Sequence, residues 1–164
     1  MCFWGIHSLM FMQKCGSLGD ACQVFEKMCC PNVVSWSAMI AGYARKGYCL
    51  ESFQLFKQMQ WAGINGNEFT YTSLLSACAN SEALRQGGKI HCHVIKIGFE
   101  PYISVGNALI TMYLKCGSLD IAREVFDEMP MQGFLSWNAI VAGYALNGDG
   151  EAALELFAND NLQI

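Results

Sequence analysis

The sequence has little charge and almost no proline: of 164 residues, 15% are charged and three are proline. Its net charge of −4 excludes a strong overall attraction to nucleic acid or anionic lipid, so local groups would have to meet an anionic partner. No uncharged apolar run reaches the roughly eighteen residues that span a bilayer. Residues 1–12 lack the basic start and cleavage site of a signal peptide. We therefore expect a soluble chain with no membrane partner, and an apolar content of 53% supplies ample core.

Metal-binding and catalytic motifs are also absent. The nine cysteines form no C-x-x-C pair, so a structural zinc site is not expected. The sequence also contains no H-x-E motif, which a zinc-dependent deaminase needs as well as C-x-x-C. We do not expect the run His91-Cys92-His93 to bind a metal ion, because side chains two residues apart on a helix point away from each other. We expect reduced, buried cysteines, no cofactor, no metal and no enzymatic activity.

Two segments of the chain occur twice at the same offset. SWSAMIAGYARKG at 35–47 returns as SWNAIVAGYALNG at 136–148, and KCGSLGDACQVFEKM at 14–28 returns as KCGSLDIAREVFDEM at 115–129. Both pairs are separated by 101 residues. A shared offset for independent segments indicates a repeated unit.

This unit is itself composed of shorter repeats. Ser37, Thr72, Asn107 and Asn138 occupy equivalent places, at spacings of 35, 35 and 31 residues. The expected repeats are 1–32, 33–67, 68–102, 103–133 and 134–164, the last of them unfinished. Because one repeat of this size cannot bury its apolar face alone, neighbouring repeats must stack.

The pattern within a repeat predicts two helices. In residues 35–46 the apolar Trp36, Met39, Ile40 and Tyr43 recur at spacings of three and four. Trp36, Trp137, Tyr43, Tyr113 and Tyr144 are expected in the core. Glycines that can adopt positive φ should end the first helices, at Gly47, Gly117 and Gly148. The run Gln86-Gly87-Gly88-Lys89 lacks the spacing of a phosphate loop, and we expect a helix break there.

Three successive stretches, VVSWSAMIAGYARKG, FTYTSLLSACANSEALRQGGKIHCHVIKIGF and SVGNALITMYLKCGSLDIAREVFDEMP, together with the 35, 35, 31 order, resemble plant pentatricopeptide repeat proteins of the triplet-organised subclass. The resemblance implies an all-α, right-handed α-solenoid of stacked antiparallel helix pairs. In its terms 33–67 and 134–164 are standard repeats, 68–102 is a long one, and 103–133 and the degenerate 1–32 are short ones.

The same resemblance implies that the protein binds single-stranded RNA in a mitochondrion or chloroplast, with one repeat per base. Its role would be in editing, processing or stability of transcripts, with RNA-processing or editing proteins as further partners. Two residues of each repeat would read the base: Ser37 with Asn67, Thr72 with Tyr102, Asn107 with Gly133, and Asn138 alone. Family usage pairs Ser37 and Asn67 with adenine, and Asn107 and Asn138 with a pyrimidine.

Two further sets of residues follow from the family pattern. Side chains one place into each repeat would clamp the bases, namely Val34, Phe69, Ser104 and Leu135. Basic residues near the ends of first helices would neutralise phosphates, namely Lys14, Arg45 and Lys115.

Two other interpretations stay open from the sequence. A polar residue repeated near the start of a helix can be a capping group instead of a base reader. A stack of helix pairs with low net basicity can also be a scaffold that binds another protein.

Overall fold

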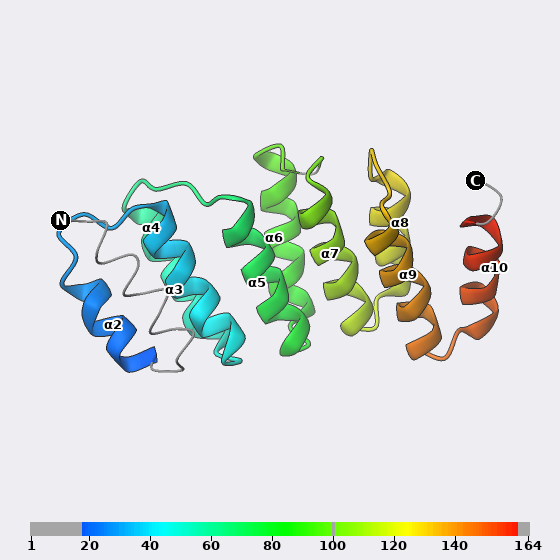
Figure 1. Cartoon of the computed structure of the whole chain (residues 1–164), viewed down its shortest axis with the longest axis horizontal. Coiled ribbons are helices and arrows are strands. Elements are labelled where there is room, and N and C mark those ends of the chain that lie inside the picture. Colours follow the sequence, from blue (N-terminus) through cyan, green and yellow to red (C-terminus); the bar gives the residue numbers. More distant parts are fainter. Residues whose placement is uncertain (1–17, 100, 161–164) are drawn as a thin grey trace. The chain divides into compact units, whose positions relative to one another are not determined.

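The computed structural model describes residues 18–99 and 101–160, and every regular element in those ranges is an α-helix (Figure 1). The helices are α2 Leu18–Glu26, α3 Val33–Arg45, α4 Cys49–Trp61, α5 Glu68–Asn80, α6 Leu84–Lys96, α7 Ile103–Lys115, α8 Leu119–Glu128, α9 Phe134–Leu146 and α10 Gly150–Asp160. The expected all-α fold class is confirmed. None of these helices is both long and apolar enough to cross a bilayer.

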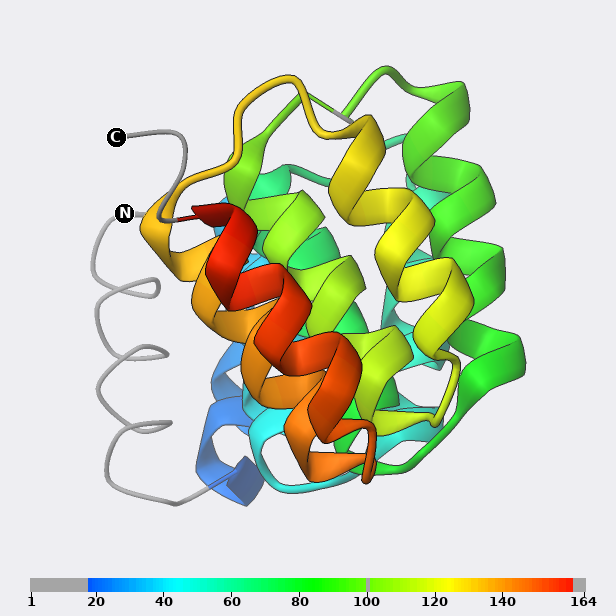
Figure 2. The same cartoon turned by 90° about the vertical axis from the view of Figure 1, so that its right-hand side faces the viewer.

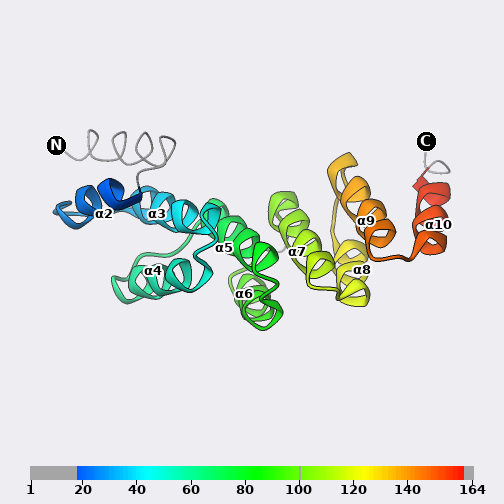
Figure 3. The same ribbon diagram turned by 90° about the horizontal axis from the view of Figure 1, so that it is seen from below.

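The chain divides into two compact units, residues 1–77 and 78–164. Unit 1 contains α2, α3, α4 and most of α5. Unit 2 contains the end of α5 and α6 to α10. Within unit 2, α7 and α9 lie side by side, and α8 packs against both from a second layer (Figure 3). The last pair, α9 and α10, runs antiparallel (Figure 2).

Glycines end three of the first helices, as the sequence predicts. Gly47, Gly117 and Gly148 have φ values of 81°, 74° and 88°. In each turn the next N–H bonds back to a carbonyl five residues earlier, as in Tyr48 N to Tyr43 O at 3.0 Å. Since only glycine adopts this left-handed conformation at little cost, these positions fix where each helix pair folds back.

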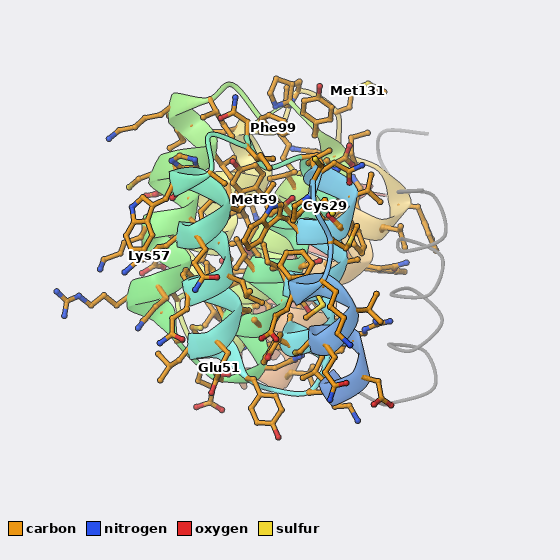
Figure 4. The ribbon with its side chains drawn as sticks, turned by 90° about the vertical axis from the view of Figure 1, so that its left-hand side faces the viewer. Cys29, Glu51, Lys57, Met59, Phe99 and Met131 are labelled. Carbon is orange, nitrogen blue, oxygen red and sulfur yellow. The ribbon has the colours of Figure 1, made fainter. Side chains whose placement is uncertain are left out.

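An aromatic contact joins α3 to α2, and an equivalent contact joins α9 to α8. Phe25 meets Trp36 edge to face with ring centroids 4.7 Å apart, and Phe126 meets Trp137 at the same separation. Such contacts add about 0.5–1.5 kcal/mol beyond the burial of area. Trp36, Tyr113 and Tyr144 are buried, as expected, whereas Tyr43 and Trp137 are half-buried. In unit 1, Met59 of α4 points toward the interior (Figure 4).

The buried tyrosines have altered acidity. Burial raises the pKa of Tyr71, Tyr113 and Tyr144. A hydrogen bond with Cys22 Sγ at 3.1 Å, together with burial, raises the pKa of Tyr43 to about 12. The fold therefore favours the protonated phenols.

The raised pKa of Tyr43 predicts a loss of stability in alkali. Its contribution is complete below the pKa of a free phenol, about 10, and is lost as pH rises toward about 12. The substitution Tyr43→Phe removes the ionisable group. Urea unfolding at pH 9 and pH 11 should show a smaller loss of stability for the variant than for the parent chain. Equal losses would contradict the assignment.

The seven cysteines in the described part of the chain are free thiols, but not all of them are buried. Cys49 and Cys78 are buried, and Cys22 and Cys116 are half-buried. Three are exposed, contrary to the expectation: Cys29, Cys30 and Cys92. Cys29 and Cys30 lie in the connection between α2 and α3, and Cys92 lies on α6.

The helix break expected at 86–89 is wrong, because α6 runs without interruption from Leu84 to Lys96. Gly87 is buried, and a Cβ at this position would come within 2.6 Å of Met112 Cε on α7. A Cβ on Gly88 would meet nothing within 4 Å. The first glycine thus permits close approach of α6 to α7, and the second has no such role.

These adjacent glycines provide a matched pair of substitutions. Gly88→Ala should stabilise the fold by about 0.5–1 kcal/mol, because alanine loses less backbone entropy in a helix. Gly87→Ala should destabilise it by about 1–3 kcal/mol, because the buried Met112 must move. Urea unfolding of both variants measures the difference, and changes of the same sign would refute this account of α6.

Candidate nucleic-acid interface

Four helices of equal length carry the expected RNA-binding residues. α3, α5, α7 and α9 each have 13 residues, and they begin at Val33, Glu68, Ile103 and Phe134. The expected base-reading residues are fifth in their helices: Ser37, Thr72, Asn107 and Asn138. The expected clamps are second: Val34, Phe69, Ser104 and Leu135. Residues two and five share one helix face, since they are three apart.

The clamp residues are exposed although most of them are apolar. Val34, Phe69 and Leu135 are 39%, 52% and 71% exposed, and Ser104 is exposed as well. An apolar side chain that stays largely exposed contributes less to folding than a buried one. It is therefore available for contact with the flat face of a ligand.

The fifth residues of α3, α5, α7 and α9 differ in their exposure to solvent. Asn138 is exposed, and Thr72 and Asn107 are half-buried. Ser37 does not face outward as expected, because it is only 1% exposed. Its Oγ donates to the Val33 carbonyl at 2.6 Å and lies 2.6 Å from Thr70 Oγ1. The same oxygen lies 3.3 Å from Asn67 Oδ1, so all three of its contacts are within the protein.

The last residue of each expected repeat stands at the N-terminus of the next first helix. Asn32, Tyr102 and Gly133 are the N-cap residues of α3, α7 and α9, and Asn67 precedes α5. Asn67 Oδ1 accepts the Thr70 N–H at 3.0 Å. These residues, and not the fifth residues, occupy the capping positions, so the capping interpretation of Ser37 and its equivalents is wrong.

A groove of about 210 Å³ lies between α3 and α5 in unit 1. It brings together three residues predicted from sequence: Arg45 from the end of α3, and Phe69 and Thr72 from the start of α5. The remaining wall is made of small side chains, namely Ala41, Ala44, Ser73 and Ser76. A cation, an exposed aromatic ring and a hydroxyl thus meet in one open hollow.

Unit 2 has a comparable groove of about 330 Å³ between α7 and α9. Lys115 ends α7 as Arg45 ends α3, and it lines this groove with Thr111 and Gly143. Its Nζ donates to Asn80 Oδ1 at 3.2 Å. The reading and clamping residues of unit 2 do not line this groove, and Lys14 lies outside the described residues.

Two residues that sequence reasoning missed contact the reading residues. Thr70 and Ser136 are third in α5 and α9, and both are fully buried. Ser136 Oγ donates to Asn107 Oδ1 at 2.6 Å, and Thr70 Oγ1 lies 2.6 Å from Ser37 Oγ. The signal was present in the sequence, since Ser35, Thr70 and Ser136 hold a hydroxyl at one place of the repeat.

Tyr102 differs from the last residues of the other expected repeats. Its ring is 47% exposed and stacks on Phe99, with centroids 4.9 Å apart and planes 23° from parallel. Gly133 has no side chain, but its N–H donates to Ser136 Oγ at 3.3 Å. Among residues 18–99 and 101–160, no group of three His, Cys, Asp or Glu could hold a metal ion.

Models of the PPR repeat family match residues 31–80, and models of the PPR repeat match 107–134 and 135–158. These ranges take in more than half of the chain. The chain belongs to the pentatricopeptide repeat family. Its helix pairs are therefore pentatricopeptide repeats, and the grooves described above lie between successive repeats.

Plant relatives share this family. The chain is 43% identical to a mitochondrial pentatricopeptide repeat-containing protein of Arabidopsis thaliana over 144 residues, which is 88% of the chain and 23% of the relative. It is 41% identical to a chloroplastic pentatricopeptide repeat-containing protein of the same species, over 91% of the chain and 17% of the relative. The chain thus spans less than a quarter of the length of these two proteins.

A solved structure has the same fold. It is that of the pentatricopeptide repeat protein PPR10 in complex with an 18-nucleotide psaJ RNA element. The match covers 96% of the present chain and 24% of the PPR10 chain, with a TM-score of 0.76 and 20% sequence identity. This similarity confirms that the chain has the α-solenoid fold of the family.

The capping role of Asn67 is testable by itself. Asn67→Ala should cost about 1 kcal/mol of stability, because Thr70 N–H loses its acceptor at the start of α5. Asn65→Ala, in the exposed connection two residues earlier, is the control and should change stability by less than about 0.5 kcal/mol. Urea unfolding measures both, and a neutral Asn67→Ala would contradict the role.

Proposed function

We propose that this chain binds single-stranded RNA by contacts from its successive repeats. The observation that carries the proposal is the unit 1 groove, in which Arg45, Phe69 and Thr72 converge from two repeats. PPR10, whose fold the chain shares, is in complex with an RNA element. The exposed apolar clamps of α3, α5 and α9 support the same function.

The chemistry of this groove suits a nucleotide. An aromatic or apolar face stacked on a base is worth about 1–3 kcal/mol. A guanidinium neutralises phosphate, and in a chain of net charge −4 such local cations are the source of attraction. A hydroxyl such as that of Thr72 both donates and accepts, so it can distinguish base edges.

We assign the repeats as 33–67, 68–102, 103–133 and 134–164, preceded by 1–32, in the triplet order of standard, long and short types. Helix starts spaced 35, 35 and 31 residues apart support this division. The reading pairs are Ser37 with Asn67, Thr72 with Tyr102, and Asn107 with Gly133, followed by Asn138. In the first pair the half-buried Asn67 is the outward member, since Ser37 is buried.

The names of the relatives support a mitochondrial or chloroplast setting for the whole protein. There the repeats would select a transcript for editing, processing or stabilisation, together with RNA-processing or editing proteins. The part played by this stretch is recognition, and the proposal includes no catalytic step within it.

Salt dependence tests the contact with phosphate. Binding of a fluorescent single-stranded RNA to the 164-residue chain should weaken as salt rises. Arg45→Gln should reduce the slope of log K against log salt by about 1. Lys57→Gln removes the same charge from α4, where Lys57 projects outward away from α3 (Figure 4), and should leave the slope unchanged.

Selection from a randomised RNA pool tests base reading. The double substitution Asn107→Ser and Gly133→Asn recreates the pair formed by Ser37 and Asn67. It should move the preference at one nucleotide from pyrimidine to adenine and leave the other positions unchanged. Identical pools before and after would refute base reading by this pair. Absence of RNA binding even at low salt would instead favour a protein-binding scaffold.

A further inference from the structure

A buried hydroxyl from the next repeat holds the reading residue of unit 2. Ser136, the third residue of α9, is fully buried, and its Oγ donates to Asn107 Oδ1 at 2.6 Å. The two residues are 29 positions apart and belong to successive repeats. Ser136 Oγ also accepts the N–H of Gly133, the other member of the pair, at 3.3 Å.

The balance of donors and acceptors fixes the orientation of the Asn107 amide. A serine hydroxyl has one proton and two lone pairs. The Gly133 N–H occupies one lone pair, and the proton goes to Asn107 Oδ1. If the amide turned over, the buried proton of Ser136 would lose this acceptor, which is unfavourable away from water. The Asn107 oxygen therefore stays inward, and its NH₂ group is the part left for a ligand.

This orientation limits which bases Asn107 can bind. An NH₂ group offers only donors. Cytosine and uracil each present two acceptors and one donor on the Watson–Crick side, whereas adenine presents one acceptor and one donor. In the Asn107 pair, where Gly133 adds no side chain, an amide fixed in this way favours a pyrimidine, and a freely turning amide, which also offers an acceptor, discriminates less.

Unit 1 contains the same arrangement independently. Thr70 is third in α5 and fully buried, and its Oγ1 lies 2.6 Å from Ser37 Oγ, the fifth residue of α3. Thr70 Oγ1 also accepts the Asn67 N–H at 3.0 Å and lies 2.9 Å from Asn67 Oδ1. The Thr70 N–H meets the same oxygen at 3.0 Å. The Asn67 oxygen is thus occupied, so the third residue of the following first helix also fixes the orientation of this amide.

We infer that Thr70 and Ser136 are positioning residues that set base specificity, each by orienting the reading pair of the repeat before it. The inference rests on the proposed RNA binding and deepens it. Base specificity at these two positions then depends on three residues, because the third residue of the following repeat decides which hydrogen-bonding groups the reading pair presents. Replacing that hydroxyl should weaken discrimination between bases more than it weakens overall binding.

The experiment compares RNAs that differ at the nucleotide assigned to Asn107, with pyrimidine or adenine at that place. Ser136→Ala should reduce the ratio of the two affinities by about two- to tenfold, the worth of one hydrogen bond. Ser136→Thr keeps the hydroxyl, as Thr70 does naturally, and should restore the ratio. Ser52→Ala is the control: Ser52 is equally buried, its Oγ donates to the Cys49 carbonyl at 2.7 Å on α4, and its loss should leave the ratio unchanged.

Thr70 provides an independent second test should Ser136→Ala fail to fold. Thr70→Val preserves shape without the hydroxyl and should reduce discrimination at the nucleotide read by Asn67, by less than Ser136→Ala does at its own nucleotide because the backbone N–H of residue 70 still bonds to the Asn67 oxygen. Thr70→Ser should restore it. An unchanged ratio in a folded hydroxyl-free variant, while the parent chain discriminates, overturns the inference alone. A parent chain without base preference overturns the proposed function and, with it, this inference.

Discussion

The apolar face of one helix pair can be buried only by the next pair, and everything else in this structure depends on that constraint. An isolated helix pair leaves one side of its first helix open to water. In unit 2 small residues let neighbouring helices approach closely, as at Gly143, where a Cβ would lie 2.7 Å from Leu114 Cδ2. The edge-to-face pairs Phe25 with Trp36 and Phe126 with Trp137 complete the contact.

The same stacking explains why the candidate site belongs to no single repeat. Arg45 ends one first helix, and Phe69 and Thr72 begin the next. The last residue of a repeat stands at the N-terminus of the next first helix, and at two junctions the third residue of that helix, Thr70 or Ser136, contacts the fifth residue of the preceding first helix. Helix capping and the candidate ligand contacts therefore share the same few side chains at these two junctions.

The family, the helix pairs and the turns followed from sequence because they arise from local rules. Periodicity of three and four, glycine at positive φ and a fixed repeat offset are properties of short stretches. The burial of Ser37 did not follow from the sequence, because it depends on Asn67 and Thr70, which are 30 and 33 residues away along the chain. The continuous α6 was missed because Gly87 serves the packing against Met112 and not a turn.

The sequence by itself determined the fold class and the spacing of the helices, since both are set by the positions of apolar residues and glycines along the chain. Only the tertiary structure decided which polar side chains face outward and which atoms they present. A hydroxyl or an amide has several possible partners, and the choice among them depends on which neighbouring helix brings a donor or acceptor within about 3 Å.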